Sequence, residues 1–485
     1  MKLKTSKILI SSWVLFIAST LLAQSDLKIS LSALDDSTFS LNWNVDKSIE
    51  IPSGSDLFLL SKPSIVDEWI VIDGPLENGA FPKEYSTQFR MESQNKFYTL
   101  GIKTIPSNRS PGEIIRTKLI KKYSLAEILT SITEYTGGFP TIISNEVNAF
   151  EIVYWTPGLD GKLREASGVA FLPVGKTSPK SIISYQHGTL YDKEDAPSLG
   201  QTEEFSIGLF LAGTEHICFM ADYLGFGASA DMFHPYLHSE TEASSALDML
   251  RAGTQLVSES NLTQPEKLFL LGYSQGGHAT MALHRTIELE AGDEFIITGS
   301  IPMAGPQSMS NVMLSRILSD APYPNPFYIA YLVWSYDQAY GLFNDPNEYF
   351  VDEVATALKQ MIQDGASDGA INDVLPTVPR QMFKSNVLEL IQSNDNHPFR
   401  VALELNDTMR SGWQPQAPIQ MYHCTDDEIV PYQNSILAKE SLQRAEGPAI
   451  SVTDPRLIPF FQNGSHTGCI PWALLAVNDW INDRI

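Results

Sequence analysis

The spacing of apolar residues divides the chain into two parts. Over residues 27–103, apolar and polar residues alternate and turn signals recur at Pro52, Pro63 and Gly79, which predicts β-strands. From about residue 120 onward, short apolar runs alternate with segments of helical periodicity, which predicts buried strands separated by helices. We therefore expect a small all-β sandwich domain over residues 25–108, followed by an α/β domain over residues 120–485.

One of the apolar runs leads into a glycine-flanked serine. The run Lys267–Leu271 is followed by Gly272-Tyr-Ser274-Gln-Gly276 and then by a helical pattern. A turn this tight between strand and helix needs small residues at Gly272 and Gly276, and it exposes Ser274 above the sheet. The free N–H groups at the start of the helix then face the serine hydroxyl. The pattern predicts a nucleophile elbow, with an ordinary structural turn as the alternative.

A nucleophilic serine needs a base and an acid, which follow it in the order Asp or Glu, then His, in folds with this elbow. Two adjacent carboxylates, Asp426 and Asp427, end a short apolar strand, and His466 is the one histidine that follows them. We prefer Asp427 as the acid, because Pro431 can then begin the next helix with the carboxylate in the loop before it. Asp426 remains the alternative. His466 lies in a glycine-flanked loop before an apolar terminal helix, and a solvated loop histidine is its alternative reading.

An acyl-transfer site also needs donors for the developing oxyanion. One is expected from the backbone of Gln275, the residue after the serine. The apolar run Ser181–Tyr185 leads into Gln186-His187-Gly188-Thr189, where Gly188 and Thr189 are candidates for the second donor, Thr189 being preferred. An ordinary strand-end turn is the alternative for this loop.

These motifs together resemble the secretory lipases of the α/β-hydrolase superfamily. The resemblance covers residues 120–485 and is carried by five segments: His187-Gly-Thr, Asp222-Tyr-Leu-Gly-Phe-Gly227, His234-Pro-Tyr, Gly272-Tyr-Ser-Gln-Gly, and Asp427-Glu-Ile-Val-Pro with His466. It implies an α/β-hydrolase fold in which Ser274, Asp427 and His466 are nucleophile, acid and base. The chain departs from the family pattern at Cys424, where members often have glycine. Asp222 is read as a scaffold residue, and His278 and His284 as satisfied helix residues.

The stretch between Ser274 and Asp427 is too long for one strand, one helix and another strand. Amphipathic helical patterns and aromatic segments fill about residues 307–409, which predicts a mostly helical cap. The apolar run 327–334 would line an acyl pocket or, alternatively, only pack the cap onto the body.

The first residues are basic and then apolar up to Leu22, with Ala23 as a small residue for cleavage. This pattern predicts a signal peptide over residues 1–23 and a secreted or periplasmic protein. No later apolar run reaches the roughly 20 residues that span a bilayer. The segments Thr38–Asn44 and Phe97–Thr104 resemble strands of fibronectin type III domains. We expect residues 25–108 to be a spacer, with substrate or surface docking as the alternative.

Three cysteines raise the question of pairing in an exported protein. Cys424 lies three residues before Asp427, and Cys469 three after His466. Because the acid and base loops must meet, a Cys424–Cys469 disulfide is a natural expectation, which separated sulfurs would contradict. Cys218 would then be a buried strand thiol.

The formal net charge of −24 disfavours nucleic acid and anionic membranes as partners. No histidine, cysteine and carboxylate spacing indicates a metal, and no glycine-rich loop with lysine indicates a phosphate cofactor. The sequence thus predicts a secreted esterase or lipase acting on small-molecule or lipid esters without a cofactor or stable membrane insertion. The alternatives are a prolyl-oligopeptidase-type serine peptidase and a noncatalytic binding protein. Its oligomeric state does not follow from the sequence.

Overall fold

The computed structural model describes six strands between residues 27 and 104, and then residues 109–485 except 137–142, 201–203, 261, 365–367, 411 and 457–462. The chain divides into two compact units, Met1–Arg109 and Ser110–Ile485. The expected signal peptide, residues 1–23, lies outside the described residues.

The first unit contains two three-stranded antiparallel sheets, with the strand orders β1-β2-β5 and β4-β3-β6. Their strands are β1 (Leu27–Ala33), β2 (Thr38–Val45), β3 (Ser55–Lys62), β4 (Ile70–Asp73), β5 (Glu84–Arg90) and β6 (Phe97–Thr104).

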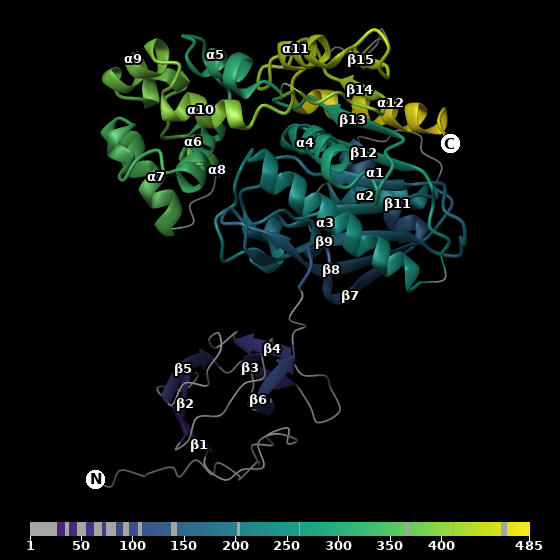
Figure 1. The fold of residues 1–485 in the computed structure, drawn as a ribbon, viewed down its shortest axis with the longest axis vertical. Coiled ribbons are helices and arrows are strands. Elements are labelled where there is room, and N and C mark those ends of the chain that lie inside the picture. Colours follow the sequence, from purple (N-terminus) through teal and green to yellow (C-terminus); the bar gives the residue numbers. More distant parts are fainter. Residues whose placement is uncertain are drawn as a thin grey trace. The chain divides into compact units, whose positions relative to one another are not determined.

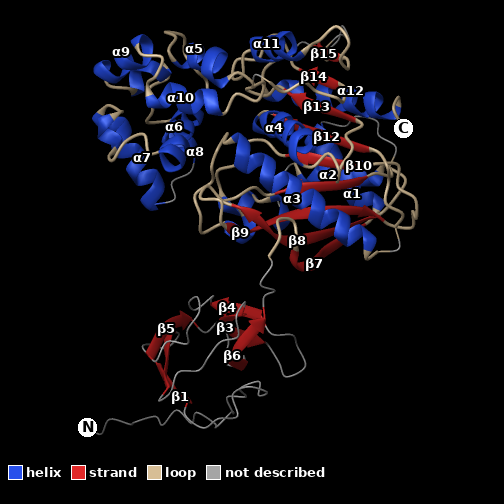
Figure 2. Cartoon of the chain, in the orientation of Figure 1, coloured by secondary structure: helices blue, strands red, loops and turns tan. Residues whose placement is uncertain are grey.

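The second unit is built on one nine-stranded sheet with the order β15-β14-β13-β12-β10-β11-β9-β8-β7 (Figure 2). Neighbouring strands from β15 to β11 pair in parallel, whereas β9, β8 and β7 pair antiparallel at one edge. The strands are β7 (Ile114–Tyr123), β8 (Val147–Pro157), β9 (Leu163–Pro173), β10 (Ile182–Gln186), β11 (Ile217–Ala221), β12 (Leu268–Tyr273), β13 (Gly299–Met303), β14 (Ile419–Tyr422) and β15 (Ile450–Thr453).

Helices cover both faces of this sheet (Figure 1). On one face, α3 (Ser239–Ser258) and α4 (Gln275–Glu290) contribute apolar side chains to one core cluster. On the other face, α1 (Leu125–Thr136), α2 (Phe205–Gly213) and α12 (Ile470–Asn482) contribute to a second cluster. A further helix, α11 (Gln433–Leu442), packs on β14 and β15. Because helices cover both faces of the sheet at β12, every residue of this strand is buried. A parallel strand in this position must be apolar along its whole length.

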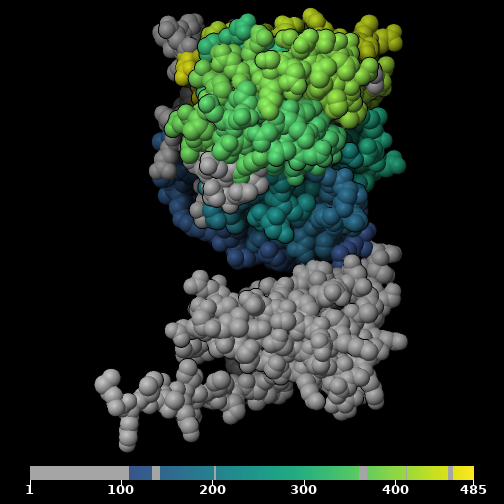
Figure 3. Space-filling view, turned by 90° about the vertical axis from the view of Figure 1, so that its left-hand side faces the viewer, coloured from purple at the N-terminus to yellow at the C-terminus, as the bar shows by residue number. Residues whose placement is uncertain are grey.

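A helical insertion, residues 307–409, separates β13 from β14. Its helices are α5 (Leu314–Ile317), α6 (Phe327–Tyr340), α7 (Asp352–Asp364), α8 (Asp368–Asn372), α9 (Ser385–Ser393) and α10 (Pro398–Leu405). These helices form most of an apolar cluster to which Tyr236, Leu237, Ile429 and Val430 also contribute. Their green atoms occupy a large part of the face of the second unit that Figure 3 shows. The two ends of the insertion meet, since the N–H of Thr408 donates to the carbonyl of Gln307 at 3.2 Å.

Among the helices that the structure describes, none combines the length and apolar character needed to cross a bilayer.

Candidate active site

Ser274 occupies the turn between β12 and α4, with φ 58° and ψ −120°. A non-glycine residue rarely adopts this backbone conformation, which costs about 1–3 kcal/mol and is concentrated at functional sites. The turn depends on close backbone approach. A Cβ on Gly276 would lie 1.9 Å from the carbonyl oxygen of Gln186 on the neighbouring β10, and one on Gly272 would lie 2.4 Å from the same atom. The two glycines therefore allow the turn to close against β10 and present the serine.

The His466 imidazole lies between the serine and a carboxylate. Its Nε2 is 2.8 Å from Oγ of Ser274, and its Nδ1 is 2.7 Å from Oδ2 of Asp427. An ionised carboxylate can only accept hydrogen bonds, so the Nδ1 atom carries the proton and donates it to Asp427. The Nε2 atom of the neutral ring is then free to accept the hydroxyl proton of Ser274.

The Asp427 carboxylate has donors on both oxygens. Its Oδ1 accepts the N–H groups of Ile429 (3.0 Å) and Val430 (2.8 Å), and its Oδ2 is 3.3 Å from Nε2 of His423 as well as facing His466. Burial alone would raise the pKa of this carboxyl, but the hydrogen bonds from His423 and His466 outweigh it and lower the pKa to about 2. The carboxylate is therefore ionised at neutral pH. The neighbouring Asp426 is exposed and pairs instead with Arg456 at 2.6 Å.

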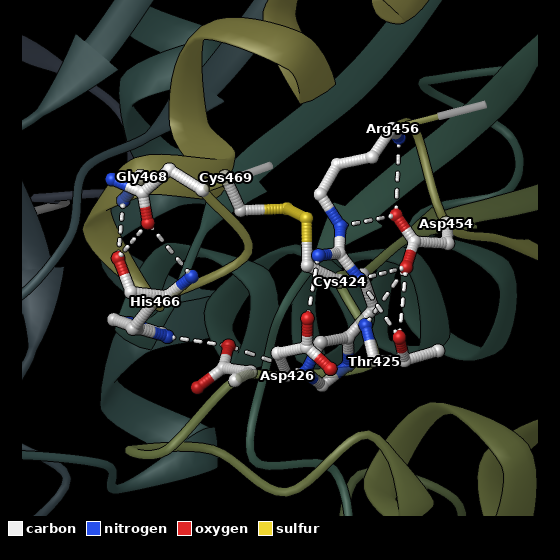
Figure 4. Close-up of a disulfide and its surroundings, with 12 residues drawn as sticks. Cys424, Thr425, Asp426, Asp454, Arg456, His466, Gly468 and Cys469 are labelled. Atoms are coloured by element: carbon white, nitrogen blue, oxygen red, sulfur yellow. Dashed lines mark hydrogen bonds and ion pairs between the residues drawn. A yellow bond between two sulfur atoms is a disulfide. The ribbon is translucent and has the colours of Figure 1, made fainter. Parts of the chain in front are cut away.

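Several contacts hold the His466 loop in place. The N–H of His466 donates to Oε2 of Glu428 (3.0 Å), and its carbonyl accepts from the hydroxyl of Tyr273 (2.5 Å). Figure 4 shows a disulfide between Cys424 and Cys469 that joins this loop to the loop carrying the acid. His423, Glu428 and Tyr273 were not identified from the sequence, although the first two flank Asp427 closely and Tyr273 precedes the serine.

Removing the disulfide through Cys424→Ala with Cys469→Ala is expected to lower the free energy of unfolding by about 4 kcal/mol. The cysteines are 45 residues apart, and a closed loop of that size loses roughly this much entropy in the unfolded chain (~4 kcal/mol). Urea unfolding, followed by tryptophan fluorescence, measures the loss. The variant Cys218→Ala retains the disulfide and should keep the full stability difference between oxidising and reducing conditions, whereas the double variant should show none. Equal stability of the double variant and the wild type would contradict this role.

Of the three predicted oxyanion donors, the N–H groups of Gln275 and Thr189 can serve this role and that of Gly188 cannot. The N–H of Gln275 lies at the first position of α4, where no intrahelical acceptor exists. Thr189 is partly exposed and its side-chain Oγ1 is 3.0 Å from the hydroxyl of Tyr236, while its N–H has no protein acceptor among the described residues. The expectation for Gly188 needs correction, because its N–H donates to Oε1 of Glu204 at 2.8 Å. Gly188 instead makes room, since a Cβ there would lie 2.9 Å from that oxygen.

Asp222 and His187 are buried next to the 187–189 loop and help to hold it. Asp222 is fully buried and accepts hydrogen bonds from the N–H of Ser198 (2.8 Å) and from the hydroxyl of Ser167. Burial raises the pKa of Asp222 to about 6 and lowers the pKa of His187 to about 4. Neither group reaches the serine, so both belong to the scaffold. His278 and His284 are buried within α4 and hydrogen-bonded.

A pocket adjoins the serine. The body contributes Ser274 and Gln275 to its wall, and the helical insertion contributes mainly apolar and aromatic side chains. The complete lining is Tyr236, Leu237, Ser274, Gln275, Pro306, Met309, Met313, Tyr323, Tyr328, Ile329, Leu332, Ile429 and Val430. The apolar run 327–334 therefore has both of the expected roles, lining the pocket and packing the insertion. Tyr328, Ile329 and Leu332 line the pocket, while other residues of α6 pack into the apolar cluster of the insertion.

Within the described residues, no group of three or more histidine, cysteine or carboxylate side chains could hold a metal ion.

The second unit is similar to solved structures of esterases and lipases. The rice cell wall degrading esterase LipA from Xanthomonas oryzae matches with a TM-score of 0.69 and 25% sequence identity, over 78% of this chain and 100% of LipA. A ligand-bound form of LipA matches with a TM-score of 0.68 and 26% identity over the same shares. Candida antarctica lipase A in its closed state matches with a TM-score of 0.54 and 20% identity, over 74% of this chain and 78% of the lipase.

No protein-family model and no curated protein matches the chain, and the comparisons lend no support to the fibronectin type III resemblance of residues 25–108. The LipA structures support hydrolase activity, whereas the lipase from Candida antarctica, at its lower identity, bears on the fold alone. The mixed sheet flanked by helices, together with these likenesses, shows that the chain has an α/β-hydrolase fold of the lipase-like kind.

Proposed function

We propose that this protein is a serine hydrolase that cleaves carboxylic esters through an acyl-enzyme. The observation that carries the proposal is the unbroken series of contacts from Ser274 through His466 to Asp427, at 2.8 and 2.7 Å. The series begins at a strained turn and lies beside an apolar pocket. Such a series is the arrangement that activates a serine hydroxyl as a nucleophile.

In the proposed reaction, Ser274 attacks the ester carbonyl while His466 takes the hydroxyl proton at Nε2. The imidazolium that forms is stabilised by the carboxylate of Asp427. Negative charge on the carbonyl oxygen is met by the N–H groups of Gln275 and Thr189. His466 then returns the proton to the departing alcohol, and water activated by the same imidazole releases the acid and restores Ser274.

The pocket supports an apolar acyl group as the part of the substrate that is recognised. Its walls are formed mainly by apolar and aromatic side chains, which suit an apolar group better than a charged one. We further propose that the protein is exported. Support for this comes from the basic and apolar N-terminal pattern and from the Cys424–Cys469 disulfide, because disulfides persist mainly in oxidising compartments.

A series of nitrophenyl esters from acetyl to palmitoyl, assayed beside a prolyl anilide, tests the proposal. We expect ester hydrolysis and covalent labelling of the Ser274 peptide by a fluorophosphonate, identified by mass spectrometry. Cleavage of the anilide without ester cleavage would instead support the prolyl-oligopeptidase-type peptidase. Neither turnover nor labelling would support a noncatalytic binding protein.

Widening the pocket should move the preferred ester to longer acyl chains. Leu332 is buried and lines the pocket, so Leu332→Ala is expected to raise kcat/KM for chains one or two methylenes beyond the optimum by about 10-fold or more per added group. The control is Val333→Ala. Val333 is the next residue on α6 and is equally buried in the same apolar cluster, but it does not line the pocket. An unchanged chain-length profile in Leu332→Ala, or the same shift in Val333→Ala, would contradict the assignment of this pocket to the acyl group.

A further inference from the structure

A buried chain of polar side chains lies beneath the residue that follows the serine. Gln275, Glu242 and His234 are each 1% exposed, and His278 is 0% exposed. They come from three different places: the start of α4, the first turn of α3, and the loop after β11. Burying so many polar groups is costly unless each is bonded, so their arrangement needs a reason.

The side-chain amide of Gln275 is held from two sides. Its Nε2 donates to Oε1 of Glu242 at 2.8 Å and lies 2.9 Å from Nε2 of His234. The Nδ1 of His234 faces the carbonyl of Leu224 at 2.8 Å and must carry the proton. The Nε2 of His234 is therefore an acceptor, and Gln275 gives one hydrogen to each partner. Both hydrogens of the amide are engaged, which fixes the side chain of Gln275 next to its own backbone N–H.

Glu242 is held in turn by His278. The Nδ1 of His278 is 2.6 Å from the second carboxyl oxygen of Glu242, and its Nε2 is 2.9 Å from the carbonyl of Asn406. The carbonyl can only accept, so Nε2 carries a proton, and a second proton is shared between Glu242 and Nδ1. The pair is thus neutral as a whole wherever that proton resides. Burial opposes the charged imidazole, but the carboxylate of Glu242 outweighs it and raises the pKa of His278.

The same chain of contacts reaches the helical insertion. Asn406 directly follows α10, and its side chain accepts from the N–H of Ser239 (2.8 Å) and donates to the hydroxyl of Tyr340 (2.8 Å). At the other end of the insertion, Nε2 of Gln307 donates to the carbonyl of Gly277 at 2.9 Å. Both ends of the insertion are therefore bonded to the first turn of α4, which carries the oxyanion donor.

We propose that Glu242 and His278 are positioning residues that orient the N–H of Gln275 toward the oxyanion and connect that donor to the helical insertion. This inference rests on the proposed ester hydrolysis. Neither side chain lines the pocket beside the serine, so their effect passes through Gln275. Complete loss of an oxyanion donor lowers kcat by about 10²- to 10³-fold. Misorienting the donor should cost less, about 10- to 100-fold in kcat, with KM nearly unchanged.

The test compares Glu242→Leu with Glu242→Gln on a nitrophenyl ester. The leucine removes the carboxylate that accepts from the Gln275 side chain, so kcat should fall about 10- to 100-fold. The amide of the second variant can accept from Gln275 and donate to Nδ1 of a neutral His278, so kcat should return to within a few-fold of the wild type. The Ki of a trifluoromethyl ketone, whose adduct with Ser274 places an oxyanion in the same position, should rise in parallel with the loss of kcat/KM.

A matched control is available on the same helix. His284 is also fully buried in α4 and also pairs with a glutamate, Glu288, at 2.8 Å, but its other contacts are with Ser300 and Trp413, which do not line the pocket. His284→Leu should lower thermal stability without changing kcat or the ketone Ki. Should Glu242→Leu not fold, Gln275→Met removes the same contacts while keeping the Glu242–His278 pair, and the same fall in kcat at constant KM is expected.

If Glu242→Leu folds and keeps the wild-type kcat and Ki, this inference is wrong while the proposed function stands. If Glu242→Leu does not fold, the same result in Gln275→Met has the same meaning. Equal losses of kcat in His284→Leu would also overturn it, because the effect would then be general to α4. Absence of ester hydrolysis in the unmodified protein would refute the proposed function, and this inference with it.

Discussion

Replacing Ser274 with alanine is expected to lower kcat for aryl esters about 10⁶-fold, which is the size of effect seen when a triad serine is removed. The remaining groups can still bind the ester and polarise its carbonyl, but no acyl-enzyme can form. His466 then has no hydroxyl to deprotonate at the 2.8 Å contact that it makes with Oγ. Steady-state hydrolysis with an active-site titration of the wild type measures the ratio.

Ser274→Gly is the informative companion to this variant. Glycine lacks the hydroxyl, so this variant should also abolish turnover. Because glycine adopts the φ of 58° and ψ of −120° at position 274 without strain, it should in addition raise the free energy of unfolding by about 1 kcal/mol or more. Alanine keeps the strain, so its stability should stay close to that of the wild type. Retention of turnover in either variant would show that the nucleophile lies elsewhere.

Asp427→Asn is expected to lower kcat about 10⁴-fold, while Asp426→Asn changes it by no more than a few-fold. An amide at position 427 can turn its NH₂ toward Nδ1 of His466, which then loses its proton and leaves Nε2 protonated and unable to accept from Ser274. The carboxylate at 427 is buried, with its oxygens already engaged by backbone N–H groups and His423. The carboxylate at 426 lies at the surface on Arg456.

The two adjacent aspartates make this comparison demanding, because both variants remove the same charge from the same loop. Their kcat values, measured at several pH values from 6 to 9, separate a role in orienting His466 from a general effect of charge. A large loss in Asp426→Asn with little change in Asp427→Asn would reverse the assignment that the sequence and the contacts favour.

Local patterns were sufficient to predict the elbow. A continuous apolar strand, a tight glycine turn and a helix are neighbours in the chain, and β12, Ser274 and α4 follow one another as expected. The acid and base could be predicted for a different reason: the order of the groups left one histidine, His466, after the aspartates. The helical character of residues 307–409 also followed from periodicity, although which side chains of α6 face the serine did not.

The parts that sequence patterns missed depend on contacts between distant segments. Gly188 lies in the predicted loop, but the carboxylate that occupies its N–H comes from Glu204, just before α2. His278 was correctly placed as a satisfied helix residue, yet its partner, Glu242, belongs to another helix. Periodicity identifies buried positions, whereas the pairing of two buried polar groups is decided by how the helices pack.

The closure of the helical insertion on itself, between Thr408 and Gln307, bears on how such an enzyme could change its substrate. A segment whose entrance and exit adjoin can be lengthened, shortened or exchanged without pulling on the strands that flank it, since the entropic cost of a longer loop grows slowly. The serine, histidine and aspartate all lie outside this segment, while a large part of the pocket wall lies within it. The proposed triad thus lies outside the stretch that supplies much of the pocket wall, and exchange of the segment between the two bonded ends is a route by which the acyl preference of the proposed esterase could change.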